Sequence, residues 1–226
     1  MRRSTLLVLV FCSLAVASAP PVFAQQRADT LFVAEKYLDF EQVADPQISP
    51  DGSQVVYTRR HVNKMEDRWE SSLWIMSADG SRNRFLTKGS SPRWSPDGSR
   101  IAYIHDGEPT GAQLFVRYMD AEGATSQVTR VNEPVGDIRW SPDGKSIGFS
   151  MFVPKTNTWK IDMPTAPTGA KWTPAPKYIT DLHYRQDRRG FNRSGFTHLF
   201  IVPADGGTAR ALTSGEWLLI KDDMAN

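Results

Sequence analysis

One pentapeptide in the chain matches a pattern used for nucleophilic chemistry. Residues 144–148 read Gly-Lys-Ser-Ile-Gly, which fits the G-x-S-x-G pattern of a nucleophilic serine. That chemistry requires a strand, a sharp turn that exposes the serine, and then a helix. Here Gly144 ends a turn motif, and Ile147 and Phe149 continue a β-type pattern, so Ser146 is expected in a strand. The sequence therefore predicts no catalytic residue.

The histidines and the cysteine do not form a metal-binding pattern. The four histidines are His61, His105, His183 and His198. No two of them have the spacing of metal ligands, and the single cysteine, Cys12, lies near the amino terminus. We predict neither a metal site nor a cofactor.

Two charged segments have side chains that suit ligand binding. The first is residues 66–70, Glu-Asp-Arg-Trp-Glu, which could hold a ligand's amino group or form a surface loop with local ion pairs. The second combines Tyr184 with Arg185, Arg188 and Arg189, which could receive a carboxylate or the backbone of an extended peptide. We predict these four residues as a substrate-binding site.

The second segment has an alternative interpretation. The same arginines could lie in a solvated loop and pair with Asp181 and Asp187. The sequence does not distinguish the two interpretations.

A repeated turn motif indicates which strands must position these residues. Ser-Pro-Asp-Gly occurs at residues 49–52, 95–98 and 141–144, at intervals of 46 residues. Proline presets φ, aspartate bonds to its own backbone, and glycine accepts a positive φ, so the motif favours a tight hairpin turn. The predicted turn residues are Pro50, Asp51, Gly52, Pro96, Asp97, Gly98, Pro142, Asp143 and Gly144.

The segments after each turn also repeat. A β-type run follows each glycine, at residues 55–57, 101–103 and 147–149. Next come a second hairpin around Asp79-Gly80, Glu122-Gly123 or Asp205-Gly206, and a closing strand that ends in an apolar residue and threonine. This predicts an all-β fold, a partial β-propeller of about three four-stranded antiparallel blades at residues 46–88, 92–130 and 137–214. An ordinary β-sandwich is the alternative.

The amino-terminal end has the composition of an export signal. Arg2 and Arg3 precede an apolar run and a small-residue cleavage site, so residues 1–24 are predicted to be a signal peptide and residues 25–45 a lead-in segment. No later run is long and apolar enough for a membrane span. Without residues 1–24 the chain has 25 basic and 25 acidic residues, which argues against a nucleic-acid partner. We expect a periplasmic or secreted protein with no membrane segment after cleavage.

The third unit contains a long insertion, predicted at residues 152–195. It carries eight Lys or Arg against three Asp, with a strand expected from Tyr178 to about Arg185 and a turn at Gly190. Long loops on a rigid scaffold often bind ligands. By the repeat spacing, a fourth Ser-Pro-Asp-Gly is expected between residues 221 and 225, where the sequence has none. We therefore expect residues 218–226 to be the truncated tail of a longer protein.

These repeats resemble a known family. Residues 45–60, DPQISPDGSQVVYTRR, and 198–217, HLFIVPADGGTARALTSGEW, are similar to blades in the amino-terminal β-propeller of exported prolyl oligopeptidase family serine peptidases, of the acylaminoacyl or dipeptidyl peptidase type. The resemblance covers about residues 32–217, and TolB-like propellers carry the same repeats.

The resemblance implies a propeller that caps an α/β-hydrolase domain and admits only short or extended peptides to it. That carboxy-terminal domain would be the chain's partner and is missing from these 226 residues, so no triad residue is assigned and the chain alone is expected to be inactive. The alternative function is a TolB-like periplasmic propeller that binds other proteins.

Overall fold

The computed structural model describes residues 34–120, 122–155, 163–174, 176–179, 182, 184–187 and 190–216. The predicted signal peptide and the predicted tail at residues 218–226 lie outside these residues. The chain divides into two units, Met1–Tyr37 and Leu38–Asn226. The described residues of the first unit form only the start of the 3₁₀ helix η1 (Ala34–Asp39). All of the sheets belong to the second unit.

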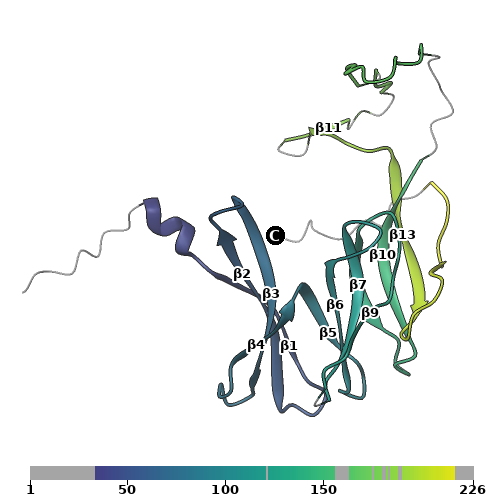
Figure 1. Ribbon diagram of the computed structural model, residues 1–226. Helices are drawn as coiled ribbons and strands as arrows, with labels where there is room; N and C mark the ends of the chain where they lie inside the picture. The colour runs from purple at the N-terminus through teal and green to yellow at the C-terminus, as the bar shows by residue number, and fades with distance from the viewer. Residues whose placement is uncertain are drawn as a thin grey trace, which may run out of the picture. The chain divides into compact units, whose positions relative to one another are not determined.

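Three four-stranded antiparallel sheets follow one another along the chain (Figure 1). The first, blade 1, contains β1 (Gln42–Ile48), β2 (Gln54–Asn63), β3 (Arg68–Ser77) and β4 (Arg84–Lys88). Blade 2 contains β5 (Ser90–Trp94), β6 (Arg100–Asp106), β7 (Ala112–Tyr118) and β8 (Thr125–Gln127). Blade 3 contains β9 (Val135–Trp140), β10 (Ser146–Pro154), β13 (Gly195–Pro203) and β14 (Arg210–Ala211). The predicted fold, a partial propeller of three four-stranded blades, is confirmed.

The Ser-Pro-Asp-Gly turns join the first two strands of each blade with one hydrogen-bond pattern. The serine hydroxyl donates to the aspartate Oδ1 at 2.6 Å in all three turns. The serine Oγ in turn accepts the backbone N–H of the residue five positions later, at 2.9 Å each time. The carboxylate therefore fixes the turn, and the serine fixes the start of the second strand.

The first strand of each blade contains a bulge that also repeats. Asp45, Ser91 and Asp137 have φ of 51°, 55° and 46°, and these positions are again 46 residues apart. The strand pairing shifts register beside each of them. A bulge in an edge strand bends it and redirects its side chains.

Two tryptophans connect neighbouring blades. The Trp94 indole N–H donates to the carbonyl of Gln47 at 3.2 Å, and the Trp140 indole N–H donates to the carbonyl of Arg93 at 2.9 Å. Each tryptophan precedes a Ser-Pro-Asp-Gly turn, and each acceptor lies in the first strand of the preceding blade. The same residue type therefore sets the register at both junctions.

Two apolar clusters fill the junctions between blades. One joins Val56, Leu73, Ile75 and Leu86 of blade 1 to Ile101 and Tyr103 of blade 2. The other joins Ala102, Leu114, Val116 and Val128 of blade 2 to residues of blade 3 that include Ile147, Phe149 and Val202. Blade 2 therefore buries one face against each of its two neighbours, as propeller blades do.

Strand pairing corrects three predicted boundaries. β1 begins at Gln42, inside the predicted lead-in, because the bulge at Asp45 interrupts the alternation by which a strand is recognised. Pairing of β10 with β13 continues to Pro154 and Gly195, so the insertion comprises residues 155–194 rather than 152–195. The strand predicted from Tyr178 is wrong, because Tyr178 and Ile179 are not in a strand and β11 (Arg185–Gln186) only begins at Arg185.

Candidate functional site

The blades have two different ends. The turn end carries the Ser-Pro-Asp-Gly turns and the turns at Gly80, Gly123 and Gly206, which all join adjacent strands. The loop end carries the connections between the second and third strands of each blade, at residues 64–67, 107–111 and 155–194. The connections at the loop end differ in length and composition, so this end is where a ligand site is expected.

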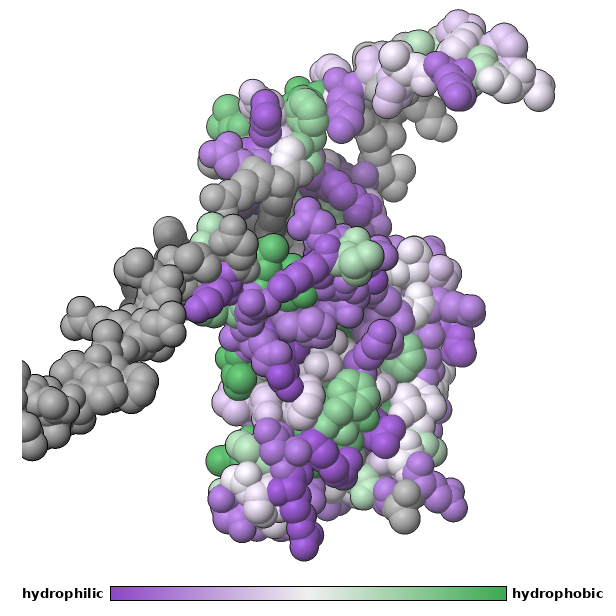
Figure 2. Space-filling model, turned by 60° about the vertical axis from the view of Figure 1, so that its left-hand side comes forward, coloured by the Kyte–Doolittle hydropathy of each residue, from purple (hydrophilic) through white to green (hydrophobic). Residues whose placement is uncertain are grey.

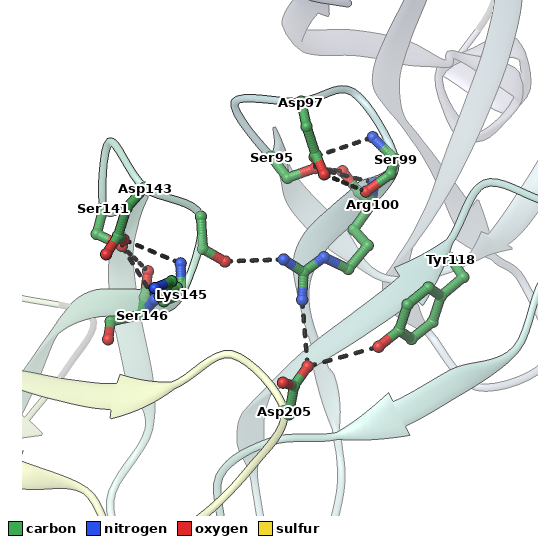
Figure 3. Close-up of polar contacts among 11 residues, drawn as sticks. Ser95, Asp97, Ser99, Arg100, Tyr118, Ser141, Asp143, Lys145, Ser146 and Asp205 are labelled. Atoms are coloured by element: carbon green, nitrogen blue, oxygen red, sulfur yellow. Dashed lines mark hydrogen bonds and ion pairs between the residues drawn. The ribbon is translucent and has the colours of Figure 1, made fainter.

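The turn end holds a polar network between blades 2 and 3 (Figure 3). Arg100 donates to the carbonyl of Gly144 at 2.8 Å and pairs with Asp205 at 3.2 Å. Its guanidinium also lies over the rings of Trp140, at 4.9 Å, and Tyr118, at 5.9 Å. Because both terminal nitrogens of Arg100 bond to groups of the scaffold, we interpret this network as structural.

A hollow of about 300 Å³ lies between blades 1 and 2 at the loop end. Blade 1 contributes Arg68, Trp69 and Glu70 to its lining, and blade 2 contributes His105 and Asp106. The lining therefore has an aromatic surface and both signs of charge. Such a lining suits a small zwitterionic or peptide-like ligand, and we call this hollow the interblade site.

The electrostatics of the interblade site centre on Glu70. A hydrogen bond from the Asn63 side chain, at 2.8 Å, is the main reason that the pKa of Glu70 is lowered. The positive charges of Arg68 and Lys88 lower this pKa further. Glu70 is thus held ionised, although its local partners already balance much of its charge.

Trp69 supplies the aromatic side of the interblade site. The Arg60 guanidinium lies 5.3 Å from its ring centroid, in a cation–π contact. Trp69 nevertheless keeps 39% of its surface exposed. Its ring can therefore contact a ligand without displacing a buried neighbour.

The predicted site on the insertion is only partly described. Tyr184 is half exposed, and its ring lies 6.3 Å from that of Phe191 in β12 (Gly190–Phe191), which pairs with β11. Arg185 is exposed and, among the described residues, has no carboxylate within ion-pair distance. The alternative interpretation included a pairing of Arg185 with Asp187, and the described residues do not show this ion pair. Arg188 and Arg189 lie outside the described residues, as does Asp181.

The described residues do not bring together a catalytic or metal-binding set. Ser146 is the first residue of β10 and pairs with Pro203, so it lies on a strand as predicted. His198 is buried and lies 3.3 Å from the Thr213 hydroxyl, far in sequence from His61 and His105. Across the described ranges, no group of His, Cys, Asp or Glu side chains could hold a metal ion. In the same part of the chain, no helix has the length and apolar character needed to span a membrane.

The sequence analysis missed one ionic contact between first strands. Arg93 Nη1 lies 2.6 Å from Asp45 Oδ2, and both side chains are largely buried. Asp45 stands at the bulge, four residues before a Ser-Pro-Asp-Gly turn. The sequence did contain a signal for the bulge that places Asp45. A residue type common in turns lies four positions before each Ser-Pro-Asp-Gly motif, at Asp45, Ser91 and Asp137.

The amino-acid sequence is similar to those of known peptidases. No family model matches the chain. It is 31% identical over 212 residues to an uncharacterized peptidase, YuxL, of Bacillus subtilis, covering 86% of this chain and 31% of that protein. This chain is related to peptidases. It is also 28% identical over 199 residues to dipeptidyl-peptidase 5 of Porphyromonas endodontalis, covering 82% of this chain and 27% of that protein.

A solved structure agrees with the fold. The acylaminoacyl peptidase of Pyrococcus horikoshii superposes with a TM-score of 0.57 at 21% identity, covering 77% of this chain and 25% of that one. At this identity the likeness supports the fold alone. The chain spans about a third or less of the length of the curated peptidases it matches.

Proposed function

We propose that the chain is the substrate-gating propeller portion of an exported serine peptidase that cleaves short peptides. The observation that carries the proposal is the 31% identity to a peptidase over 212 residues that make up 31% of that protein. In the proposal, the rest of the polypeptide includes an α/β-hydrolase domain with the catalytic triad.

The gating role follows from the physics of a rigid cap. Stacked blades joined by buried aliphatic clusters do not open easily, so a propeller over a catalytic site excludes folded proteins and admits short chains. The interblade site and the basic insertion would contact such chains, because their exposed groups match the carbonyls and charged ends of a peptide. Tyr184, Arg185, Arg188 and Arg189 remain the proposed contacts on the insertion.

The test begins with the coding sequence around these 226 residues. A G-x-S-x-G segment on a strand, turn and helix in the same reading frame supports the proposal. A frame with blades alone would overturn it and favour a protein-binding module.

The whole protein should then cleave dipeptide to decapeptide amides and leave folded globular proteins intact. Deleting the blades while keeping the hydrolase should abolish that size discrimination. Equal rates on short and folded substrates with the blades present would contradict gating.

Site contacts can be tested in the same whole protein. Arg185→Ala should raise KM for short peptides with little change in kcat, since it removes binding made equally in the ground and transition states. Lys171→Ala, in the described part of the same insertion, is the matched control. An unchanged KM for Arg185→Ala would remove Arg185 from the proposed site.

Export is proposed from residues 1–24 and can be tested separately. Cell fractionation should place the protein in the periplasm or medium, and amino-terminal sequencing should begin at Gln25. A cytoplasmic protein that retains Met1 or its neighbours would contradict export without affecting the peptidase proposal.

A further inference from the structure

The first strands of the three blades carry polar residues at repeated positions. These strands are neighbours, because β1 contacts β5 and β5 contacts β9. One repeated position is occupied by Gln47, Arg93 and Arg139, and the position two residues earlier by Asp45, Ser91 and Asp137. The two junctions between blades can therefore be compared residue by residue.

The junction between blades 1 and 2 contains a complete ion pair. Arg93 reaches back to blade 1, where its Nη1 lies 2.6 Å from Asp45 Oδ2. The same nitrogen donates to the carbonyl of Pro92 at 2.6 Å. The Gln47 side chain donates to Oδ1 of the same carboxylate at 2.8 Å. This carboxylate is thus bound by one guanidinium and one amide.

The junction between blades 2 and 3 has the arginine without the carboxylate. Arg139 Nη1 donates to the carbonyl of Ile138 at 2.9 Å, as Arg93 does to the residue before it. The residue equivalent to Asp45 is Ser91, whose hydroxyl is shorter and uncharged. Arg139 is exposed, and no carboxylate of the described residues lies within ion-pair distance of it. Its guanidinium can therefore bind a carboxylate from outside the chain.

The backbone places Ser91 in the same way as Asp45. The two residues have φ of 55° and 51°. The strand pairing shifts register beside each of them. The indole bonds of Trp94 and Trp140 to the preceding first strand also repeat at the two junctions. The space beside the Arg139 guanidinium therefore corresponds to the space that the Asp45 carboxylate fills.

Neighbouring groups do not replace the missing carboxylate. Asp137, the carboxylate nearest to Arg139 in sequence, accepts a hydrogen bond from the Ser150 hydroxyl at 3.0 Å. Because Arg93 reaches back to the preceding blade, the corresponding neighbours of Arg139 belong to blade 2, which is described. The face seen in Figure 2 is mostly hydrophilic, with scattered hydrophobic residues. A charged ligand group suits such a surface better than an extended apolar one.

We propose that Arg139 and Ser91 form a binding site for the carboxylate of a short peptide, the Arg139 site. The peptide carboxylate takes the place that the Asp45 side chain has beside Arg93, and accepts hydrogen bonds from the guanidinium and the serine hydroxyl. The Arg139 site lies between blades 2 and 3, whereas the interblade site lies between blades 1 and 2. The proposal concerns binding alone, so it does not depend on the proposed peptidase function.

The first test titrates N-acetyl-trialanine into the purified full chain. The ¹⁵N NMR signal of the Trp140 backbone amide, next to Arg139, is the readout. It should shift with half-saturation in the millimolar range, and high salt should weaken the binding, because an exposed ion pair is weak and screened. The amide of the same peptide, which lacks the carboxylate, should cause no saturable shift. Equal responses to the acid and the amide would overturn the proposal.

The source of the carboxylate is tested with N-acetyl-aspartic acid α-amide. This compound carries only a side-chain carboxylate, whereas N-acetyl-trialanine carries only a terminal one. Saturable binding of either compound supports the proposal, and the tighter of the two identifies the preferred source. If neither compound gives a saturable shift, the Arg139 site does not exist.

Two substitutions and a matched control test the residues. Arg139→Gln should weaken binding at least tenfold, because it removes the charged donor. Ser91→Asp should do the same by supplying an internal carboxylate, and the positive φ at this position tolerates aspartate, as it does at Asp45. Ser126→Asp adds the same charge at an exposed position of β8 in the same blade and should leave binding unchanged. Equal weakening by both Ser→Asp variants, with β content unchanged by circular dichroism, would overturn the proposal.

Asp45→Ser tests the equivalence of the two junctions. It removes the carboxylate from Arg93 and should thereby create a second site for the same peptide. The backbone amide of Trp94 should then shift on titration together with that of Trp140. In the unchanged chain the Trp94 amide should not respond. A folded Asp45→Ser chain in which the Trp94 amide stays unresponsive would contradict the equivalence on which the Arg139 site rests.

Discussion

The turn end and the loop end of the blades differ in how regular their connections are. At the turn end, three carboxylates and three serines repeat one geometry, with Ser–Asp oxygen distances of 2.6 Å in every blade. At the loop end, the connections between the second and third strands range from a few residues to the insertion at 155–194. The repeated turns hold the blades in register at one end, so the connections at the other end are free to differ in length and charge.

The largest expected change in the free energy of unfolding comes from a buried residue at a blade junction, in contrast to a residue in the insertion. Leu114→Ala should lower the free energy of unfolding by about 2–5 kcal/mol, because it leaves a cavity between blades 2 and 3. Trp172→Ala, at a half-exposed position in the insertion, should change it by no more than about 0.5 kcal/mol. Urea denaturation measures both. Similar losses would show that the insertion is part of the scaffold.

The next effect concerns the tryptophan that joins blades 2 and 3. Trp140→Phe should cost about 1–2 kcal/mol of unfolding free energy, since it removes the indole bond to Arg93 and weakens the contact with Arg100. The matched control is Trp172→Phe, which should be near neutral because Trp172 is half exposed in the insertion. A loss no larger than that of the control would mean that the indole bond does not hold the junction.

Local chemistry explains why the turn end was predictable from the sequence. Pro96, Asp97 and Gly98 each have a conformational preference that the turn uses, so a four-residue motif suffices. The interval of 46 residues then predicts repeated sheets, and blades 1 to 3 confirm it. The bulges were missed because a residue with positive φ, such as Asp45, interrupts the alternation that identifies a strand.

Long-range contacts explain why the loop end was less predictable. Tyr178 to Arg185 is rich in β-favouring residues, yet β11 forms only where Arg185 and Gln186 find a partner in β12. The interblade site combines Trp69 with His105, which blade packing brings together across 36 positions of sequence. Neither residue belongs to a recognisable motif, so only the fold shows that they share a hollow.

A smaller effect comes from the carboxylates at the turn end. Serine and backbone hydrogen bonds lower the pKa of Asp51 and Asp97 to about 2, with Ser49 and Ser95 as the largest causes. Aspartate in an unfolded chain titrates near 3.9. The turns should therefore stabilise the fold above about pH 4, and this stabilisation should decrease as the pH falls toward 2.

Asp97→Asn isolates that contribution. Its thermal midpoint should fall less than that of the unchanged protein between pH 4 and pH 2, because one titrating turn has been removed. Asp187→Asn, in the insertion, should keep the full pH dependence. Identical acid profiles for the Asp97 variant and the unchanged protein would show that the turn carboxylates do not couple to folding.

The smallest stability effect is expected at the loop end. Tyr184→Ala should change the unfolding free energy by no more than about 0.5 kcal/mol, because Tyr184 is half exposed on a two-stranded hairpin. In the whole protein the same substitution should raise KM for short peptides. A large loss of stability without a change in KM would reverse the roles assigned to the two ends.

Hydrogen exchange of the tryptophan indoles, followed by ¹⁵N NMR, tests the stacking of the blades most directly. The indole N–H groups of Trp94 and Trp140 should exchange slowly, because each donates to the first strand of the preceding blade. The indole of Trp172, half exposed in the insertion, should exchange quickly. Exchange of Trp94 and Trp140 as fast as that of Trp172 would contradict the stacking of three repeated sheets through these two bonds.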